Sequence, residues 1–132
     1  MNNEFNRVRL DRGVSNQLKR LQQTTGLTPN HLARIGLCYS LREPRPPAPD
    51  EYNTEGKVIN RFTLLGDHDA LYMALLRKRI EQDGYDPDEE LYHHLLAHIN
   101  RGVESLSGRV HDLTDLYDLL PDEVQEGTVA DG

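Results

Sequence analysis

The first forty residues contain a short alternating segment, followed by two helix-length segments with a tight corner between them. In residues 6–10, two arginines fall on one face of an extended chain, and Val8 and Leu10 fall on the other. A strand this short needs a partner strand to be stable. Strand, helix, corner, helix is the outline of a ribbon-helix-helix unit. The sequence therefore predicts a mainly α-helical fold with a ribbon-helix-helix-like start.

The two helices of this unit have clear boundary signals. The first is predicted over residues 14–25, because four side chains share one stripe: Val14, Leu18, Leu21 and Thr25. Gly26 suits the position just after a helix. Thr28 followed by Pro29 suits the start of the next one, which is predicted over residues 29–41.

The second helix is apolar on two sides. One face carries Leu32, Ile35, Gly36 and Tyr39, and another carries Ala33, Leu37 and Leu41. A helix that is apolar on two sides is usually buried on two sides. In a chain of 132 residues, we expect the second side to meet another subunit, with Leu37 at that interface.

Charge is distributed unevenly along the chain. Residues 1–49 hold eight Lys and Arg against three acids, whereas residues 50–132 hold seven against nineteen. The acidity of the second part also suits simple solubility, but the basic first part indicates an anionic partner, with nucleic acid as the leading candidate. The predicted phosphate contacts are Arg9, Arg12, Lys19, Arg20 and Arg34, with Arg7 beside them. Aromatic residues are sparse there, which favours duplex DNA over stacking on single strands.

The rest of the chain is predicted to form one further helical half. We expect a single domain over residues 1–120, comprising an N-terminal half at 6–42, a Pro-rich connector at 43–50 and a C-terminal half at 57–120. Helix signals in the C-terminal half predict the following elements: a strand or extended lead-in at 58–65, a helix from Asp67 or Asp69 to Gln82, a helix from Pro87 with a core stripe of Leu91, Leu95, Ile99 and Val103, and a short helix at 112–120. Residues 121–132 form an acidic tail that we expect to be disordered.

Residues with catalytic or metal-binding chemistry are few. His94 and His98 have the spacing of a shared metal site, but no second cluster supplies further ligands, and half-buried histidines at the edge of an apolar stripe are the favoured interpretation. Cys38, the single cysteine, is expected to be a small buried side chain. The basic run 77–79 is expected to pair with acids such as Glu81. No triad, phosphate loop or dinucleotide motif is present, so we expect no catalytic residue, no metal and no cofactor.

The cellular compartment can also be predicted from the sequence. One cysteine excludes an internal disulfide and suits a reducing environment. There is no apolar run of signal-peptide or membrane-spanning length. The sequence therefore predicts a cytoplasmic protein with no membrane partner.

Several short segments between residues 7 and 118 follow one another in a characteristic order: Arg7-Val8-Arg9-Leu10, Gln17-Leu18-Lys19-Arg20-Leu21, Thr25-Gly26-Leu27, Cys38-Tyr39-Ser40-Leu41 with Glu43-Pro44, Leu71 to Arg77, and Asn100-Arg101-Gly102-Val103 through Gly108. Their order gives the chain a resemblance to the DndE family of DNA sulfur modification (phosphorothioation) proteins. The resemblance implies a homo-oligomer, a tetramer, that binds double-stranded or nicked DNA and works with the other Dnd subunits. It also implies DNA contacts from basic residues of the first helices, here Lys19, Arg20 and Arg34.

The leading hypothesis is a non-catalytic accessory subunit of the phosphorothioation machinery that grips the DNA backbone. A ribbon-helix-helix transcription factor or antitoxin is the first alternative, reading bases with Arg7 and Arg9. An enzyme is the second, either a nickase or a sulfur carrier that uses Cys38. Residues 50–120 disfavour the first alternative, because a minimal repressor does not need them.

Overall fold

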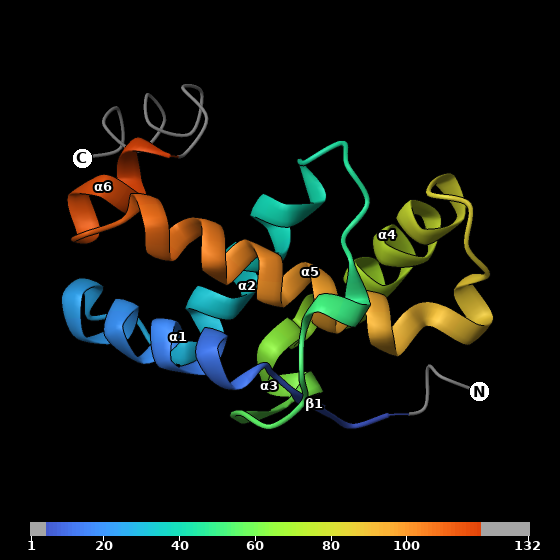
Figure 1. The fold of residues 1–132 in the computed structure, drawn as a ribbon, viewed down its shortest axis with the longest axis horizontal. Helices are drawn as coiled ribbons and strands as arrows, with labels where there is room; N and C mark the ends of the chain where they lie inside the picture. Colours follow the sequence, from blue (N-terminus) through green and yellow to red (C-terminus); the bar gives the residue numbers. More distant parts are fainter. Residues whose placement is uncertain (1–4, 120–132) are drawn as a thin grey trace.

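A long central helix organises the fold. The computed structural model describes residues 5–119, and α5 (Pro87–Arg109) runs through their middle. Helix α2 (Pro29–Leu41) crosses α5, while α1 (Arg12–Thr25) and α4 (Asp69–Gln82) pack against it on either side (Figure 1). The mainly α-helical prediction is confirmed.

Helices α2 and α5 meet at two glycines. A Cβ added to Gly36 would lie 3.0 Å from the backbone nitrogen of Val103, and a Cβ on Gly102 would overlap the carbonyl group of Gly36. The two backbones are therefore in direct contact, which leaves no room for a side chain at Gly102 and only a tight fit for one at Gly36. Leu32, Leu37 and Ile99 are almost fully buried in the core beside this crossing.

Helix α2 is buried along one broad face by its own chain, while Ile35, Tyr39 and Leu41 are only half-buried. Its buried residues are Leu32, Ala33, Gly36, Leu37 and Ser40. The expectation that Leu37 lies at a subunit interface is wrong, because this side chain is 1% exposed within the core of a single chain. A charge at this position would disrupt the fold itself. Oligomerisation stays a prediction, but Leu37 is no longer an argument for it.

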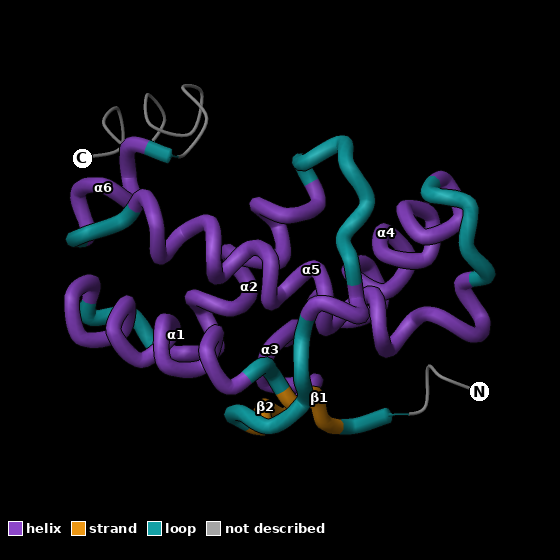
Figure 2. Tube along the Cα trace, viewed as in Figure 1, coloured by secondary structure: helices purple, strands orange, loops and turns teal. Residues whose placement is uncertain are grey.

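The ribbon is completed within the chain. Strand β1 (Arg7–Arg9) pairs antiparallel with β2 (Val58–Asn60), and Val8 lies opposite Ile59. Both of these apolar residues are buried, and the two strands lie at one edge of the molecule, shown in orange in Figure 2. The partner that β1 was expected to need is thus supplied by the same chain, about fifty residues later.

The segment 58–65 is a strand followed directly by a helix. Asn60 ends β2 and caps α3 (Arg61–Leu65), since its side-chain oxygen accepts from the backbone nitrogens of Phe62 and Thr63 at 2.8 and 3.1 Å. A single 3₁₀ turn, Gly66–His68, then leads into α4. The strand was one of the two predicted alternatives, and α3 was not predicted.

The other boundaries follow their capping signals. Asp11 caps α1 and Thr28 caps α2, and Gly26 adopts the left-handed conformation (φ 77°) between them. Asp86 caps α5, and α6 (Leu113–Asp118) ends the described chain after its own cap, Asp112. A short 3₁₀ turn, Pro49–Glu51, closes the Pro-rich connector. The predicted tail at 121–132 lies outside the described residues. Within residues 5–119, no helix combines the length and the apolar character that crossing a membrane requires.

The close approach of α2 and α5 at Gly36 and Gly102 leads to a prediction about stability. We expect Gly102→Ala to lower the free energy of unfolding by about 2 kcal/mol, because the new methyl group must push α2 away from α5. Gly108→Ala is the matched control in the same helix. Nothing lies within 4 Å of a Cβ at that position. We expect the control to be neutral or stabilising by up to about 1 kcal/mol. Urea unfolding compares the two, and equal effects would contradict the close crossing.

Candidate nucleic-acid interface

The outward face of the ribbon carries two arginines. Val8 points into the core, so its neighbours Arg7 and Arg9 are exposed on the other face of β1. The predicted alternation is confirmed. These guanidinium groups stand on a backbone held by strand pairing, which fixes where they leave the surface.

Helix α1 extends this basic face. Arg12, Lys19 and Arg20 are exposed on α1, while its buried stripe is the one predicted. Lys57, just before β2, is exposed as well and adjoins the ribbon, because its carbonyl accepts from the backbone nitrogen of Leu10 at 2.9 Å. We call this set the N-terminal basic surface: Arg7, Arg9, Arg12, Lys19, Arg20 and Lys57.

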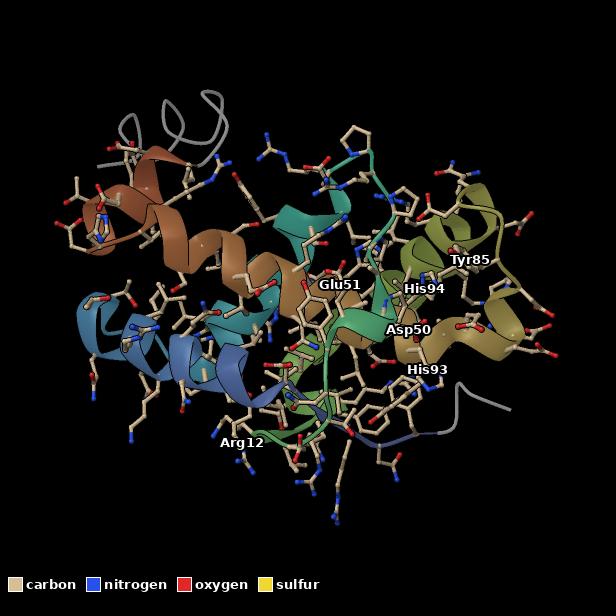
Figure 3. The ribbon with its side chains drawn as sticks, in the orientation of Figure 1. Arg12, Asp50, Glu51, Tyr85, His93 and His94 are labelled. Carbon is tan, nitrogen blue, oxygen red and sulfur yellow. The ribbon has the colours of Figure 1, made fainter. Side chains whose placement is uncertain are left out.

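The charges of this surface are not neutralised by close partners. Among residues 5–119, none of its six side chains has a carboxylate within ion-pair distance. Figure 3 shows side-chain nitrogens projecting from the lower edge of the molecule, around Arg12. An anion approaching this edge meets fixed positive charge in water, which is the arrangement that long-range attraction of polyanions requires.

The junction between β1 and α1 is tied to distant parts of the chain. The Asp11 carboxylate accepts from the backbone nitrogens of Val14 (3.1 Å) and Asn53 (3.0 Å). The Asn53 side chain in turn accepts from the backbone nitrogen of Arg12 at 3.0 Å. The buried Asn100 of α5 accepts from the backbone nitrogen of Asp11 at 3.1 Å. The backbone at Asp11 and Arg12 is therefore held in place by hydrogen bonds to residues from the second half of the chain.

Arg34 is used differently from the other predicted DNA contacts. Its Nε donates to the carbonyl of Leu64 at 2.6 Å, and one terminal nitrogen donates to the carbonyl of Thr63 at 3.2 Å. These carbonyls belong to the end of α3, so Arg34 satisfies helix-terminal acceptors. Arg9, Arg12, Lys19 and Arg20 are exposed on β1 and α1, whereas Arg34 has a bonding role within the fold.

The basic run on α4 is also largely engaged. Arg77 pairs with Asp88, and Arg79 pairs with Asp83 at 2.9 Å. The predicted pairing with acids is thus confirmed, although these partners differ from Glu81, the acid suggested by the sequence. Lys78 is exposed.

The two candidate metal ligands are core residues. His94 and His98 are both fully buried, so the expectation of half-buried side chains is wrong. His98 Nδ1 lies 2.8 Å from the Ser40 hydroxyl, and burial, reinforced by nearby Arg101, lowers the pKa of His98 to about 3. Burial also lowers the pKa of His94. Residues 5–119 contain no grouping of His, Cys, Asp and Glu suited to a metal ion.

Cys38 is exposed, which contradicts the expectation of a buried side chain. Helix α2 turns this position away from the core, and its sulfur lies 3.8 Å from the Tyr72 hydroxyl. Burial, and then the contact with Cys38, raises the pKa of Tyr72. The thiol therefore neighbours a neutral phenol.

The chain is similar to proteins of one known family. The family described as DNA sulphur modification protein DndE matches residues 7–112. The chain belongs to the DndE family. This family is involved in DNA phosphorothioation.

Two solved DndE structures share the fold of this family member over most of its length. One is DndE from Escherichia coli B7A, involved in DNA phosphorothioation modification, with 29% identity and a TM-score of 0.65 over 77% of this chain and 96% of that one. The other is a DndE G21/24K mutant, with 26% identity and a TM-score of 0.63 over 77% and 97% of the two chains. No curated protein matches the chain significantly.

The buried histidines predict a pH dependence of stability. Below pH 6.5 the unfolded chain takes up protons at His98, whereas the folded state takes one up only near pH 3. Stability should therefore fall as pH drops below 6.5, by up to about 1.4 kcal/mol per pH unit for this histidine. His98→Gln should flatten that dependence, and His93→Gln, at an exposed position, should leave it unchanged. Urea unfolding between pH 7.5 and pH 4.5 measures this. Identical slopes in all three proteins would contradict the assignment.

Proposed function

We propose that this chain is a DNA-binding accessory subunit of the phosphorothioation machinery, and that it grips duplex or nicked DNA through phosphate groups. The observation that supports this function is the N-terminal basic surface, whose six cations lack carboxylate partners among residues 5–119. The proposal includes action in the cytoplasm beside the other Dnd subunits and assembly as a homo-oligomer, a tetramer. It assigns no catalytic residue and no cofactor to the chain.

Backbone binding suits the chemistry of this surface. Arginine can hold a phosphate with two parallel hydrogen bonds, and lysine adds a point charge. The cations come from a strand, a helix and a loop, so they are spread over a broad area. A broad, exposed set of cations attracts any duplex similarly, because phosphates carry no sequence information.

Base reading by the ribbon is the second candidate function. Arg7 and Arg9 face outward from β1, and arginine can recognise guanine in the major groove. The second strand of this ribbon comes from the same chain, so the ribbon is complete without a second subunit. A repressor of this kind would show strong preference for one site, which separates it from backbone binding.

The salt dependence of DNA binding tests the proposal. Removing one cation that neutralises a phosphate should reduce the slope of log K against log salt by about 0.9. We expect Lys19→Ala with Arg20→Ala to weaken binding to two unrelated duplexes equally and to flatten the slope by roughly two. Fluorescence anisotropy at three salt concentrations measures both quantities. The matched control, Arg77→Ala with Lys78→Ala, removes the same charge from α4 and should have a much smaller effect.

Two outcomes would contradict backbone binding through this surface. A large loss of affinity for one duplex and little loss for the other would favour base reading. No change in affinity or slope would make Lys19 and Arg20 ordinary solvated side chains.

The role of Cys38 is tested separately. Its exposure means that alkylation alone does not distinguish a catalytic thiol from an accessible one. We expect Cys38→Ala to keep DNA phosphorothioation in cells, with a decrease in stability of at most about 1 kcal/mol. Cys38→Ser is the polar control. If the alanine variant folds normally but abolishes modification, the sulfur-carrier alternative replaces the non-catalytic assignment.

A further inference from the structure

An arginine-lined pocket lies at the end of α2, apart from the surface discussed above. It has a volume of about 270 Å³ and opens between the last residues of α2, the segment that follows, and α5. We call it the arginine pocket, after the four side chains that dominate its lining: Arg42, Arg45, Arg101 and Arg109. Glu43 is the single acid among its lining residues, all of which belong to the described part of the chain.

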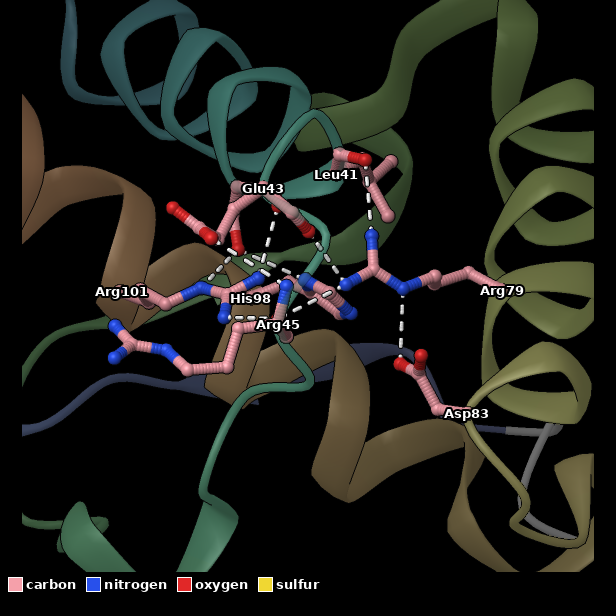
Figure 4. Close-up of polar contacts among 8 residues, drawn as sticks. Leu41, Glu43, Arg45, Arg79, Asp83, His98 and Arg101 are labelled. Atoms are coloured by element: carbon pink, nitrogen blue, oxygen red, sulfur yellow. Dashed lines mark hydrogen bonds and ion pairs between the residues drawn. The ribbon is translucent and has the colours of Figure 1, made fainter.

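One wall of the pocket is rigid. Arg101 donates to the Ser40 hydroxyl (2.8 Å), the Ser40 carbonyl (2.9 Å) and the Arg45 carbonyl (2.6 Å). Arg79 donates from the other side to the carbonyls of Leu41 (2.9 Å) and Glu43 (2.6 Å). Figure 4 shows the two guanidinium groups holding the turn after α2 between them. The backbone that carries Arg42 and Arg45 is therefore fixed before any ligand arrives.

Positive charge is in excess around this wall. Partial burial and the neighbouring Arg79 lower the pKa of Arg101, and Arg45 adds to this effect while Glu43 opposes it. The carboxylate of Glu43 is oriented toward its own turn, where it accepts from the Arg45 backbone nitrogen at 3.4 Å. One acid thus faces several guanidinium groups at close range.

The remaining three arginines offer donors to a ligand. Arg42, Arg45 and Arg109 are exposed, and none forms an ion pair with any residue of 5–119. Arg109 is positioned by the Tyr39 ring, whose centroid lies 5.7 Å from its guanidinium carbon. Such unpaired arginines around a concave site suit an oxyanion that accepts several hydrogen bonds at once.

We propose that the arginine pocket binds a phosphate group. Its volume holds on the order of nine waters, which leaves room for one phosphate with part of its hydration shell. The phosphate can come from the DNA backbone or from a small phosphate-bearing molecule. The DNA source rests on the proposed function, whereas the pocket itself does not.

The pocket is a second site and not an extension of the N-terminal basic surface. In Figure 1 the turn after α2 lies at the upper edge of the molecule, with α5 between it and the ribbon. Arg12 lies at the lower edge in the same orientation (Figure 3). The two cationic regions therefore face different directions.

Inorganic phosphate is the first probe. We expect its ³¹P NMR signal to broaden on adding the wild-type protein, and we expect phosphate to raise the melting temperature above that in chloride of equal ionic strength. Arg42→Gln with Arg109→Gln should abolish both effects. Arg77→Gln with Lys78→Gln removes the same charge from α4 and should keep both. Equal responses in the two double variants, or no response in the wild type, would overturn the proposal.

Duplex DNA then identifies the source of the phosphate. If the pocket holds one backbone phosphate, Arg42→Gln with Arg109→Gln should reduce the salt slope by about 0.9, a change separate from that of Lys19 and Arg20. If phosphate binding is abolished while duplex binding is unchanged, the pocket serves a small phosphate-bearing molecule. Failure of the Lys19 and Arg20 variants to alter DNA binding would remove the proposed function but leave the phosphate measurement standing.

Discussion

The contact between Gly36 and Gly102 sets the distance between the two helices on which everything else is arranged. With no Cβ on either side, α2 lies backbone to backbone against α5. This closeness puts Ser40, one turn further along α2, within reach of both His98 and Arg101. A wider crossing would separate these groups and leave buried polar atoms unpaired, which costs more free energy than the hydrogen bonds themselves contribute.

The end of α2 is stabilised by arginines from two other helices. The Ser40 carbonyl accepts from the backbone nitrogen of Glu43 (3.0 Å) and from Arg101 (2.9 Å), and the Leu41 carbonyl accepts from Arg79 (2.9 Å). Positive charge at this end also complements the helix dipole. The arginines that donate to the carbonyls at the end of α2 also concentrate positive charge there. The hydrogen bonds that end the helix therefore also make the arginine pocket electropositive.

Local signals were sufficient for the helices and insufficient for the packing between them. The start of α2 at Pro29 and of α5 at Pro87 followed from caps and prolines next to them in sequence. The pairing of β1 with β2 joins residues about fifty positions apart, and no local pattern in three-residue strands specifies such a partner. Helix α3 is one turn long and depends on its cap and on Arg34, which explains why its periodicity was not visible.

The candidate sites also differ in whether a local sequence pattern predicts them or they depend on packing between distant segments. Lys19 and Arg20 were predictable as exposed, because the apolar stripe of α1 determines the opposite face. The arginine pocket was not, since its members come from two segments nearly sixty residues apart. The exposure of Cys38 was not predictable, because apolar neighbours in sequence do not tell which side of α2 packs against the core. The histidines were misjudged because α5, unlike a surface helix, is enclosed through its central turns.

The internal ribbon has a consequence for how ligand binding and folding are coupled. Arg9 belongs to β1 and Lys57 directly precedes β2, so these two cations come from different halves of the chain. A polyanion that contacts both acts as a tether across the pair and binds only when it is formed. By mass action, such a ligand stabilises the folded chain as a whole. A fragment ending before residue 50 would lack β2 and leave Val8 uncovered, so the basic surface is a property of the intact chain and cannot be moved as a module.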